Sequence, residues 1–392
     1  MIHHCNFKKA KLIKNCTAQH LSLKRFYVFL LHMLQKVFKA FGLAVDISKA
    51  VPFGSGLINH TWKIKNGNSV FILQRINDQV FKNPGAIAYN VEITGKYLQQ
   101  LYPDYLFVMP LKSIYKEDIF FDEEHGYFRL SPFIENSHTI DVVKEPEQAY
   151  EAAAQFGKFT KLLADFDVSK FKISLPDFHN LTLRYQQFEQ ALLNGNAERI
   201  QQSEKLIDTI IANKSITDVF EKIKLNPHFK IRVTHHDTKI SNVLFDDNNK
   251  GLCVIDLDTL MSGYFISDVG DMLRTYLSPV SEEEKDFAKI EVRDDYFVAI
   301  AEGYLGQLKN ELNEEEKKHF VYAGKFMIYM QAMRFLTDYI NNDIYYGSKY
   351  AEHNFIRAGN QLILLQKLID KEDKLQQLIT NFNSTQTNAN NL

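Results

Sequence analysis

Two short segments of the chain end apolar runs with polar side chains that could do chemistry. The first reads Val233-Thr-His-His-Asp-Thr-Lys-Ile-Ser-Asn-Val-Leu-Phe245 and places Asp237 five residues before Asn242. The second, Cys253-Val-Ile, ends at Asp256. Phosphoryl transfer from a nucleotide needs one carboxylate to accept a hydroxyl proton and hard oxygen ligands to hold Mg²⁺. The residue types and their order therefore indicate nucleotide-dependent phosphoryl transfer.

The spacing within this region distinguishes that hypothesis from ordinary turns. Asp and Asn are common in turns, so each of these residues could be structural. A turn alone does not explain why two apolar strands both end in carboxylates. His235, Asp237 and Asn242 form the H-x-D-x(4)-N pattern of kinase catalytic loops, and Asp256 follows Asp237 by 19 residues. We expect His235 to hold the loop through backbone hydrogen bonds rather than to take part in the chemistry.

A glycine-containing turn lies upstream, where a kinase needs a loop over the phosphates. It reads Phe53-Gly-Ser-Gly-Leu-Ile-Asn59 and supplies Gly54, Ser55 and Gly56 between two predicted strands. A plain hairpin is the alternative for so short a pattern. The glycine-containing turn comes before the candidate strand and helix, as the phosphate loop of a kinase does, and this order favours contact with a nucleotide.

A strand-borne cation and a helix acid should follow that turn. The strand position falls at Gln74, which cannot supply a cation, with Arg75 beside it. Side chains alternate along a strand, so the two cannot face one side without a bulge, and the sequence leaves open which faces the phosphates. Glu92, 18 residues after Gln74, is the candidate helix acid, and a solvated helix face is its alternative.

The elements that must position these residues fall into two groups. Asn66-Gly67 predicts a hairpin within residues 62–76, and Pro84 opens a predicted helix over 84–102. Further strands are expected near 105–110 and 126–134. Helices are expected at about 145–165, 180–192, 198–223, 281–308 and 314–341, interrupted by a strand-rich insert over 231–258. The pattern predicts a small β-rich lobe, a connector near 133–138 and a larger helical lobe.

Composition excludes several other classes of protein. Lys and Arg number 46 and Asp and Glu 48, so the net charge of −2 gives no reason to expect a nucleic acid or membrane partner. Three unpaired cysteines exclude a disulfide framework and a Cys-built zinc site. The longest mostly apolar run, Phe26–Leu34, is about half of a membrane span. We expect a soluble, cytoplasmic protein.

The two ends of the chain differ from its body. Residues 1–45 contain eight basic residues and no acidic ones. We treat them as a basic extension with three open interpretations: a crude secretory signal, a basic arm for anionic partners, or a segment that is not translated because synthesis starts at Met33. Residues 381–392 are polar and uncharged, which predicts a disordered tail.

Taken together, the chain resembles the aminoglycoside phosphotransferase/choline kinase branch of the protein-kinase-like fold. Within that branch it is most similar to bacterial N-acetylhexosamine 1-kinases. The similarity covers about residues 50–365. It is carried by Gly54-Ser-Gly-Leu-Ile-Asn-His-Thr, Phe71-Ile-Leu-Gln-Arg-Ile-Asn77, Pro132-Phe-Ile-Glu-Asn-Ser137, Phe156-Gly-Lys-Phe159, Pro176-Asp-Phe-His-Asn180, the insert over 235–258, Asp268-Val-Gly-Asp-Met-Leu-Arg274 and Arg334-Phe-Leu-Thr-Asp-Tyr339.

The resemblance implies an α+β, bilobal protein-kinase-like fold with ATP and Mg²⁺ as cofactors. Residues 46–136 would form the nucleotide-binding N-lobe, and residues 137–380 a helical C-lobe with the catalytic loop and acceptor site. Asp237 would be the catalytic base, and Asn242 and Asp256 the Mg²⁺ ligands. Asp258 is a weaker candidate for contact with metal or substrate.

Three further residues are candidates for the acceptor site. Arg334 would bind sugar or phosphate oxygens, unless it forms an intrahelical ion pair with Asp338. Asp177 and His179 could line the pocket, although Asp177 is equally suited to capping a helix. Asp268 and Asp271 resemble the carboxylates that brace the catalytic loop in this family.

The function expected from the sequence is ATP- and Mg²⁺-dependent phosphorylation of a small molecule. The preferred acceptor is the anomeric hydroxyl of an N-acetylhexosamine or a related sugar. One alternative keeps the chemistry and changes the acceptor to an aminoglycoside, choline, homoserine or methylthioribose. Another is a nucleotide-binding pseudokinase, supported only by the missing strand lysine.

Overall fold

The computed structural model describes residues 32–44, 50–54 and 58–389. The chain divides into two compact units. The first comprises the chain up to Ala88 together with Val108–Glu135, and the second comprises Tyr89–Phe107 together with Asn136–Leu392. Within the described residues, no helix is both long and apolar enough to cross a lipid bilayer.

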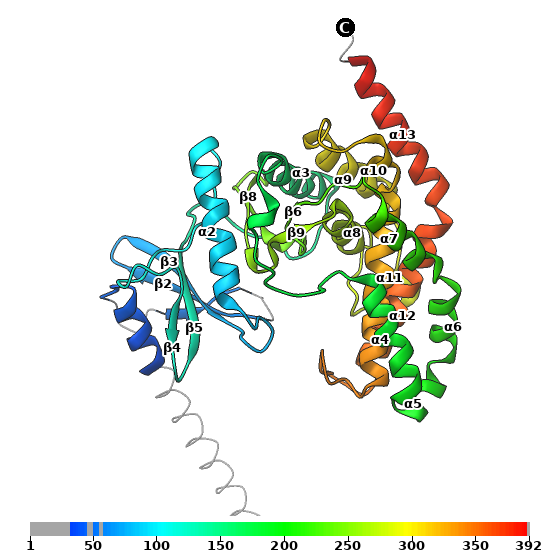
Figure 1. Ribbon diagram of the computed structural model, residues 1–392, viewed down its shortest axis with the longest axis horizontal. Coiled ribbons are helices and arrows are strands. Elements are labelled where there is room, and N and C mark those ends of the chain that lie inside the picture. The colour runs from blue at the N-terminus through cyan, green and yellow to red at the C-terminus, as the bar shows by residue number, and fades with distance from the viewer. Residues whose placement is uncertain (1–31, 45–49, 55–57, 390–392) are drawn as a thin grey trace, which may run out of the picture. The chain divides into compact units, whose positions relative to one another are not determined.

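The first unit is built on a five-stranded antiparallel sheet (Figure 1). The strand order is β1-β2-β3-β5-β4. The predicted hairpin joins β2 to β3, with Gly67 at a φ of 61° that favours glycine. The strands are β1 (Ala50–Pro52), β2 (His60–Asn66), β3 (Ser69–Ile76), β4 (Phe120–Asp122) and β5 (Gly126–Pro132).

One face of this sheet is covered by a helix formed by residues 32–40. Met33, Leu34, Val37 and Phe38 recur at helical spacing and pack in one buried cluster with residues of β2, β3 and β5. The basic extension expected over residues 1–45 therefore ends in a helix that belongs to the core of this unit. The interpretations that concern residues 1–31 lie outside the described residues.

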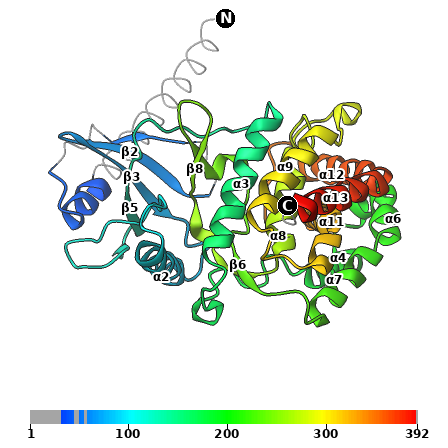
Figure 2. The same ribbon diagram turned by 90° about the horizontal axis from the view of Figure 1, so that it is seen from above.

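The second unit is mainly helical, which confirms the α+β class predicted from the sequence (Figure 1). The long helix α11 packs against α4, α8 and α12, and α3 packs along α9 (Figure 2). The helix α2 (Pro84–Leu101) starts in the first unit and continues in the second. The others are α3 (Pro146–Leu162), α4 (Leu181–Asn194), α5 (Ala197–Gln202), α6 (Glu204–Ala212), α7 (Ser215–Leu225), α8 (Phe265–Tyr276), α9 (Asp294–Gln307), α10 (Glu314–Lys318), α11 (Phe320–Ile340), α12 (His353–Asp370) and α13 (Glu372–Ala389).

Two pairs of short antiparallel strands form the predicted insert. The strand β6 (Arg232–Thr234) pairs with β9 (Met261–Gly263), and β7 (Val243–Phe245) pairs with β8 (Gly251–Val254). The chain between β6 and β7, and the chain between β8 and β9, carry the candidate catalytic residues.

Several predicted boundaries differ from the structure. No strand forms over 105–110, and the helix expected over 198–223 is divided into α5, α6 and α7. The helix expected to start at Ser281 starts only at Asp294, because Asn360 of α12 binds the backbone carbonyls of Ser281 and Glu284 and holds this segment in an irregular conformation. The tail predicted to be disordered continues α13 up to Ala389.

Candidate active site

The loop after β6 brings Asp237 and Asn242 together. A 3-10 turn, Ile240–Asn242, ends the loop and turns Asn242 back toward Asp237. The Asn242 Nδ2 atom donates to Asp237 Oδ2 at 3.1 Å and to the backbone oxygen of Asp237 at 2.9 Å. The five-residue spacing of Asp237 and Asn242 thus corresponds to a hydrogen-bonded pair. Among the described residues, no group donates to the Asn242 Oδ1 atom.

A buried carboxylate on α8 holds the start of this loop. Asp268 accepts the backbone N–H groups of His235 at 3.1 Å and of His236 at 2.8 Å. Its backbone oxygen accepts the Thr238 hydroxyl at 2.7 Å. The His235 ring contacts the Ile255 carbonyl at 2.9 Å, which is the structural role expected for this histidine. Burial raises the pKa of Asp268 to about 7, although its two N–H bonds favour the ionised form.

The second candidate segment is tied to the first through the backbone. The Ile255 N–H donates to the Asn242 carbonyl at 2.8 Å, so Asp256 directly follows a fixed point of the catalytic loop. Asp256 is exposed and adopts a left-handed conformation with φ of 59°. His236 shares this conformation, with φ of 66°. Such strained residues cluster at functional sites. Asp258, by contrast, is buried, with 3% of its surface exposed.

A cation that the sequence analysis did not single out lies on the same loop. Lys239 Nζ lies 2.8 Å from Asp237 Oδ1. Burial alone would raise the pKa of Asp237, but the charge of Lys239, with smaller contributions from His235 and Asn242, holds that pKa below its usual value. Asp237 is therefore ionised at neutral pH. The two-residue spacing from Asp237 was the signal that could have identified Lys239.

Further charged groups surround the loop within the second unit. Arg274 pairs with Asp271 at 2.9 Å and with Glu282 at 2.7 Å. Burial raises the pKa of Asp271, against the neighbouring charge of Arg274. No described group donates a hydrogen bond to the buried Asp271 Oδ2 atom. Asp268 and Asp271 thus differ, because only Asp268 braces the loop directly.

The turn before α4 brings two acceptor candidates to the side of the catalytic loop. The His179 ring stacks on Phe178 with centroids 4.3 Å apart and lies 5.3 Å from the ring of His236. Burial lowers the pKa of His179 well below its usual value, and nearby cationic groups lower it further, so the ring is neutral. Asp177 is exposed at a φ of 53° and accepts from Asn180. Asn180 is itself the N-cap of α4, so Asp177 does not cap that helix.

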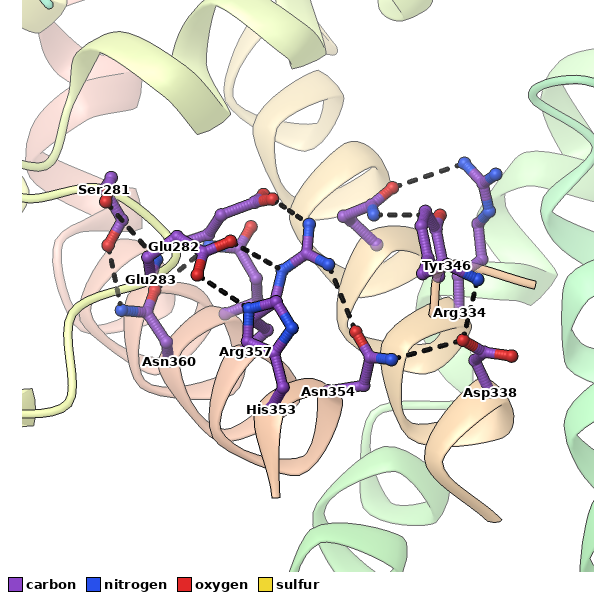
Figure 3. Close-up of polar contacts among 12 residues, drawn as sticks. Ser281, Glu282, Glu283, Arg334, Asp338, Tyr346, His353, Asn354, Arg357 and Asn360 are labelled. Atoms are coloured by element: carbon purple, nitrogen blue, oxygen red, sulfur yellow. Dashed lines mark hydrogen bonds and ion pairs between the residues drawn. The ribbon is translucent and has the colours of Figure 1, made fainter. Parts of the chain in front are cut away.

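Arg334 does not form the intrahelical ion pair considered as its alternative. Asp338 instead accepts the backbone N–H groups of Tyr345 at 2.7 Å and of Tyr346 at 2.9 Å. It also accepts the side-chain amide of Asn354, and Figure 3 shows Asp338 with Tyr346 and Asn354. Arg334 Nη1 donates to Gln331 at 3.3 Å, and its guanidinium lies 5.9 Å from the Phe178 ring. Arg334 therefore lies with the turn that carries Asp177 and His179.

A second guanidinium, that of Arg184 on α4, contacts the same turn. Arg184 Nη2 donates to the backbone oxygen of Asp177 at 2.8 Å. Burial, and then the charge of Arg334, lower the pKa of Arg184. The aromatic rings of Tyr345 and Tyr346 lie 5.7 and 5.4 Å from the Arg334 guanidinium. The turn, α4 and α11 together form a cluster rich in hydrogen-bond donors and aromatic rings.

In the first unit, the structure separates the two residues left open by the sequence. Leu73 belongs to the buried cluster, so Arg75 lies on the face covered by residues 32–40 and Gln74 on the opposite face. Gly54 has a φ of 82°, which favours glycine, whereas Ser55 and Gly56 lie outside the described residues. In α2, which continues into the second unit, Glu92 pairs with Lys96 at 2.8 Å.

Comparison with known proteins identifies a family for most of this arrangement. Residues 49–304, more than half of the chain, match a family described as the phosphotransferase enzyme family. This confirms the broader resemblance inferred from the sequence, while the closer similarity to N-acetylhexosamine 1-kinases stays a prediction.

Solved structures share the fold at low sequence identity. An amicoumacin kinase, in complex with AMP-PNP, Ca²⁺ and Ami, is 12% identical with a TM-score of 0.59, over 86% of this chain and 93% of that one. A microcompartment-associated aminopropanol kinase is 12% identical with a TM-score of 0.60, over 88% and 98%. Choline kinase from Cryptosporidium parvum is 16% identical with a TM-score of 0.51, over 90% and 98%. These similarities support the kinase-like fold.

Proposed function

Because the chain belongs to the phosphotransferase enzyme family, we propose that it transfers the γ-phosphate of ATP to a hydroxyl group of a small molecule. The observation that carries this proposal is the arrangement of Asp237, Lys239 and Asn242 on one braced loop. Asp237 is ionised, partly exposed and held in a fixed position, as a base that accepts a hydroxyl proton must be. The solved amicoumacin kinase, which carries an ATP analogue, supports ATP as the donor.

Lys239 and Asn242 have separate roles in this proposal. Asn242 orients the Asp237 carboxylate through its Nδ2 atom. Lys239 pairs with the other carboxylate oxygen and places a positive charge beside the position of the transferring phosphoryl group. The acceptor hydroxyl donates its proton to Asp237 as its oxygen attacks the γ-phosphorus, and ADP leaves.

The donor set of the second unit fits Mg²⁺. Asn242 uses its Nδ2 atom for Asp237, which leaves its Oδ1 atom as a hard oxygen ligand. Asp256 supplies an exposed carboxylate, and the residue before it, Ile255, is hydrogen-bonded to the backbone of Asn242. When bound by Asn242 and Asp256, the ion would offset negative charge on the phosphates of ATP. Asp258 is buried, which favours Asp256 as the ligand.

We further propose a sugar, with its anomeric hydroxyl as the acceptor group. Arg184 of α4 and Arg334 of α11 place two cationic groups beside the turn that precedes α4, and like charges disfavour choline or an amine there. Guanidinium, imidazole and aromatic groups suit the hydroxyls and the apolar face of a sugar ring. Asp177, His179 and Arg334 are the proposed contacts.

A panel of acceptors with ATP and Mg²⁺ tests both levels of this proposal. N-acetylhexosamines, their 1-O-methyl glycosides, choline, aminopropanol and kanamycin should be compared, and the product should be identified by phosphorus NMR. We expect a sugar 1-phosphate from the free sugars and no product from the glycosides. A preference for the amines would overturn the sugar but leave the phosphotransferase in place. ATP binding without transfer to any acceptor would favour a pseudokinase.

A further inference from the structure

The sheet of the first unit carries a paired glutamine and arginine at its centre. The register of β3 and β5 places Gln74 directly opposite Arg129. The Arg129 Nε atom donates to Gln74 Oε1 at 2.9 Å, and Gln74 Nε2 donates to Thr61 on β2 at 3.3 Å. Arg129 keeps only 6% of its surface exposed. One polar row thus crosses three neighbouring strands.

This row lies on the face opposite the buried cluster. Phe128 and Leu130, the neighbours of Arg129, and Leu73, the neighbour of Gln74, all belong to that cluster. Because side chains alternate along a strand, Gln74 and Arg129 share the other face. Arg75 lies on the covered face and does not join them.

The chemistry of the pair explains why no lysine stands at position 74. A lysine there would face the Arg129 guanidinium directly across the strands, and like charges in that position destabilise a sheet. The neutral amide of Gln74 instead accepts from Arg129 and fixes the plane of its guanidinium. The positive charge is therefore present at this level of the sheet, on β5 instead of β3.

We propose that Arg129 is the cation that the first unit contributes to the phosphates of the nucleotide, with Gln74 as its positioning residue. The inference rests on the proposed function, because it assumes ATP as the ligand. A guanidinium suits phosphate oxygens through its planar set of donors. Its burial strengthens the interaction, because screening by water is weaker there.

Calorimetry of ATP·Mg²⁺ binding tests the assignment on the full chain. We expect Arg129→Gln to weaken ATP binding about 10- to 100-fold, as for the loss of a charge-assisted hydrogen bond. Adenosine has no phosphate, so its affinity should not change, whereas a general distortion of the unit would weaken both ligands. Lys65→Gln, at an exposed position of β2, is the matched control for loss of one charge from the sheet.

Three further variants keep the test decisive if Arg129→Gln folds poorly. Arg129→Lys keeps the charge and should keep part of the affinity for ATP. The double variant Gln74→Lys with Arg129→Gln moves the charge to β3 and should bind ATP more tightly than Arg129→Gln alone. Gln74→Leu should raise KM for ATP severalfold and leave kcat unchanged, as expected of a positioning residue.

Some outcomes would overturn the assignment. If Arg129→Gln bound ATP within twofold of the Lys65→Gln control, Arg129 would not contact the phosphates. If Arg75→Gln caused the larger loss, the cation would lie on the other face of the sheet. Either result would leave the proposed function intact. A wild-type chain that binds no ATP would overturn the proposed function and this inference with it.

Discussion

The catalytic loop of the second unit and the sheet of the first unit fix their polar groups in different ways. On the loop, Asp237, Lys239 and Asn242 are neighbours in sequence, and Lys239 and Asn242 both contact the Asp237 carboxylate directly. On the sheet, Gln74 and Arg129 are 55 residues apart and meet only through strand register. Polar groups that are neighbours in the chain can therefore be grouped from the sequence, whereas groups that meet only through strand register cannot.

The largest expected effect concerns the loop. Asp237→Asn should lower kcat about 10²- to 10⁴-fold, because the amide keeps the volume but cannot accept the proton. Affinity for ATP should change little, in contrast to Arg129→Gln on the sheet. Steady-state kinetics and calorimetry on the same preparation measure both. Near wild-type turnover in this variant would remove Asp237 from the role of base.

The second prediction concerns the core beneath the sheet. Phe38 is 3% exposed and packs in the cluster formed with β2, β3 and β5. Phe38→Ala should lower the free energy of unfolding of this unit by about 3–5 kcal/mol, because it leaves a cavity. Lys39→Ala on the exposed side of the same helix is the control. Equal melting temperatures for the two variants would show that the helix does not stabilise the sheet.

The contact between Asp237 and Asn242 could be predicted from the sequence, since both belong to one pattern that spans 22 residues from His235 to Asp256. Lys239 lies within that pattern, but the pattern alone does not show that it pairs with Asp237. Arg129 could not be identified, because local sequence does not specify which residue of β5 lies opposite Gln74.

Tertiary contacts account for the other differences between sequence and structure. The spacing of Arg334 and Asp338 is correct for an ion pair, but two backbone N–H groups of the following loop occupy the carboxylate. The capping signal at Ser281 fails because Asn360, far along the chain, binds the carbonyls that a helix would have used. The sequence around Asp338 or Ser281 does not reveal which distant or following groups will bind it.

The third prediction tests the bracing of the loop by Asp268 of α8. Asp268→Asn can keep only one of the two N–H bonds to His235 and His236. We expect kcat to fall up to about 10²-fold, because small displacements of a catalytic group are costly, while KM for ATP changes little. Asp286→Asn, which removes one carboxylate from an exposed turn, is the control. A change confined to KM for ATP would contradict a bracing role.

The smallest effect expected is a dependence of stability on pH around the loop. Burial lowers the pKa of His179, His235 and His236, the last to about 4. Below about pH 6.5 the unfolded chain takes up protons on these rings more readily than the folded chain does, so stability falls as the pH falls from 7 to 5. Asp268 and Asp271, with raised pKa values, act in the opposite direction.

Three rings act in one direction and two carboxyls in the other, so we expect the free energy of unfolding to fall as the pH falls from 7 to 5. Denaturant unfolding of the second unit at pH 7, 6 and 5 measures this dependence. His179→Gln should make the free energy of unfolding depend less steeply on pH, because glutamine binds no proton in either the folded or the unfolded chain. His228→Gln, at an exposed position, should leave this dependence unchanged. Stability that is constant or rises as the pH falls to 5 would mean that the buried rings are protonated in the folded chain, and the loop would then be less sheltered from water than its contacts indicate.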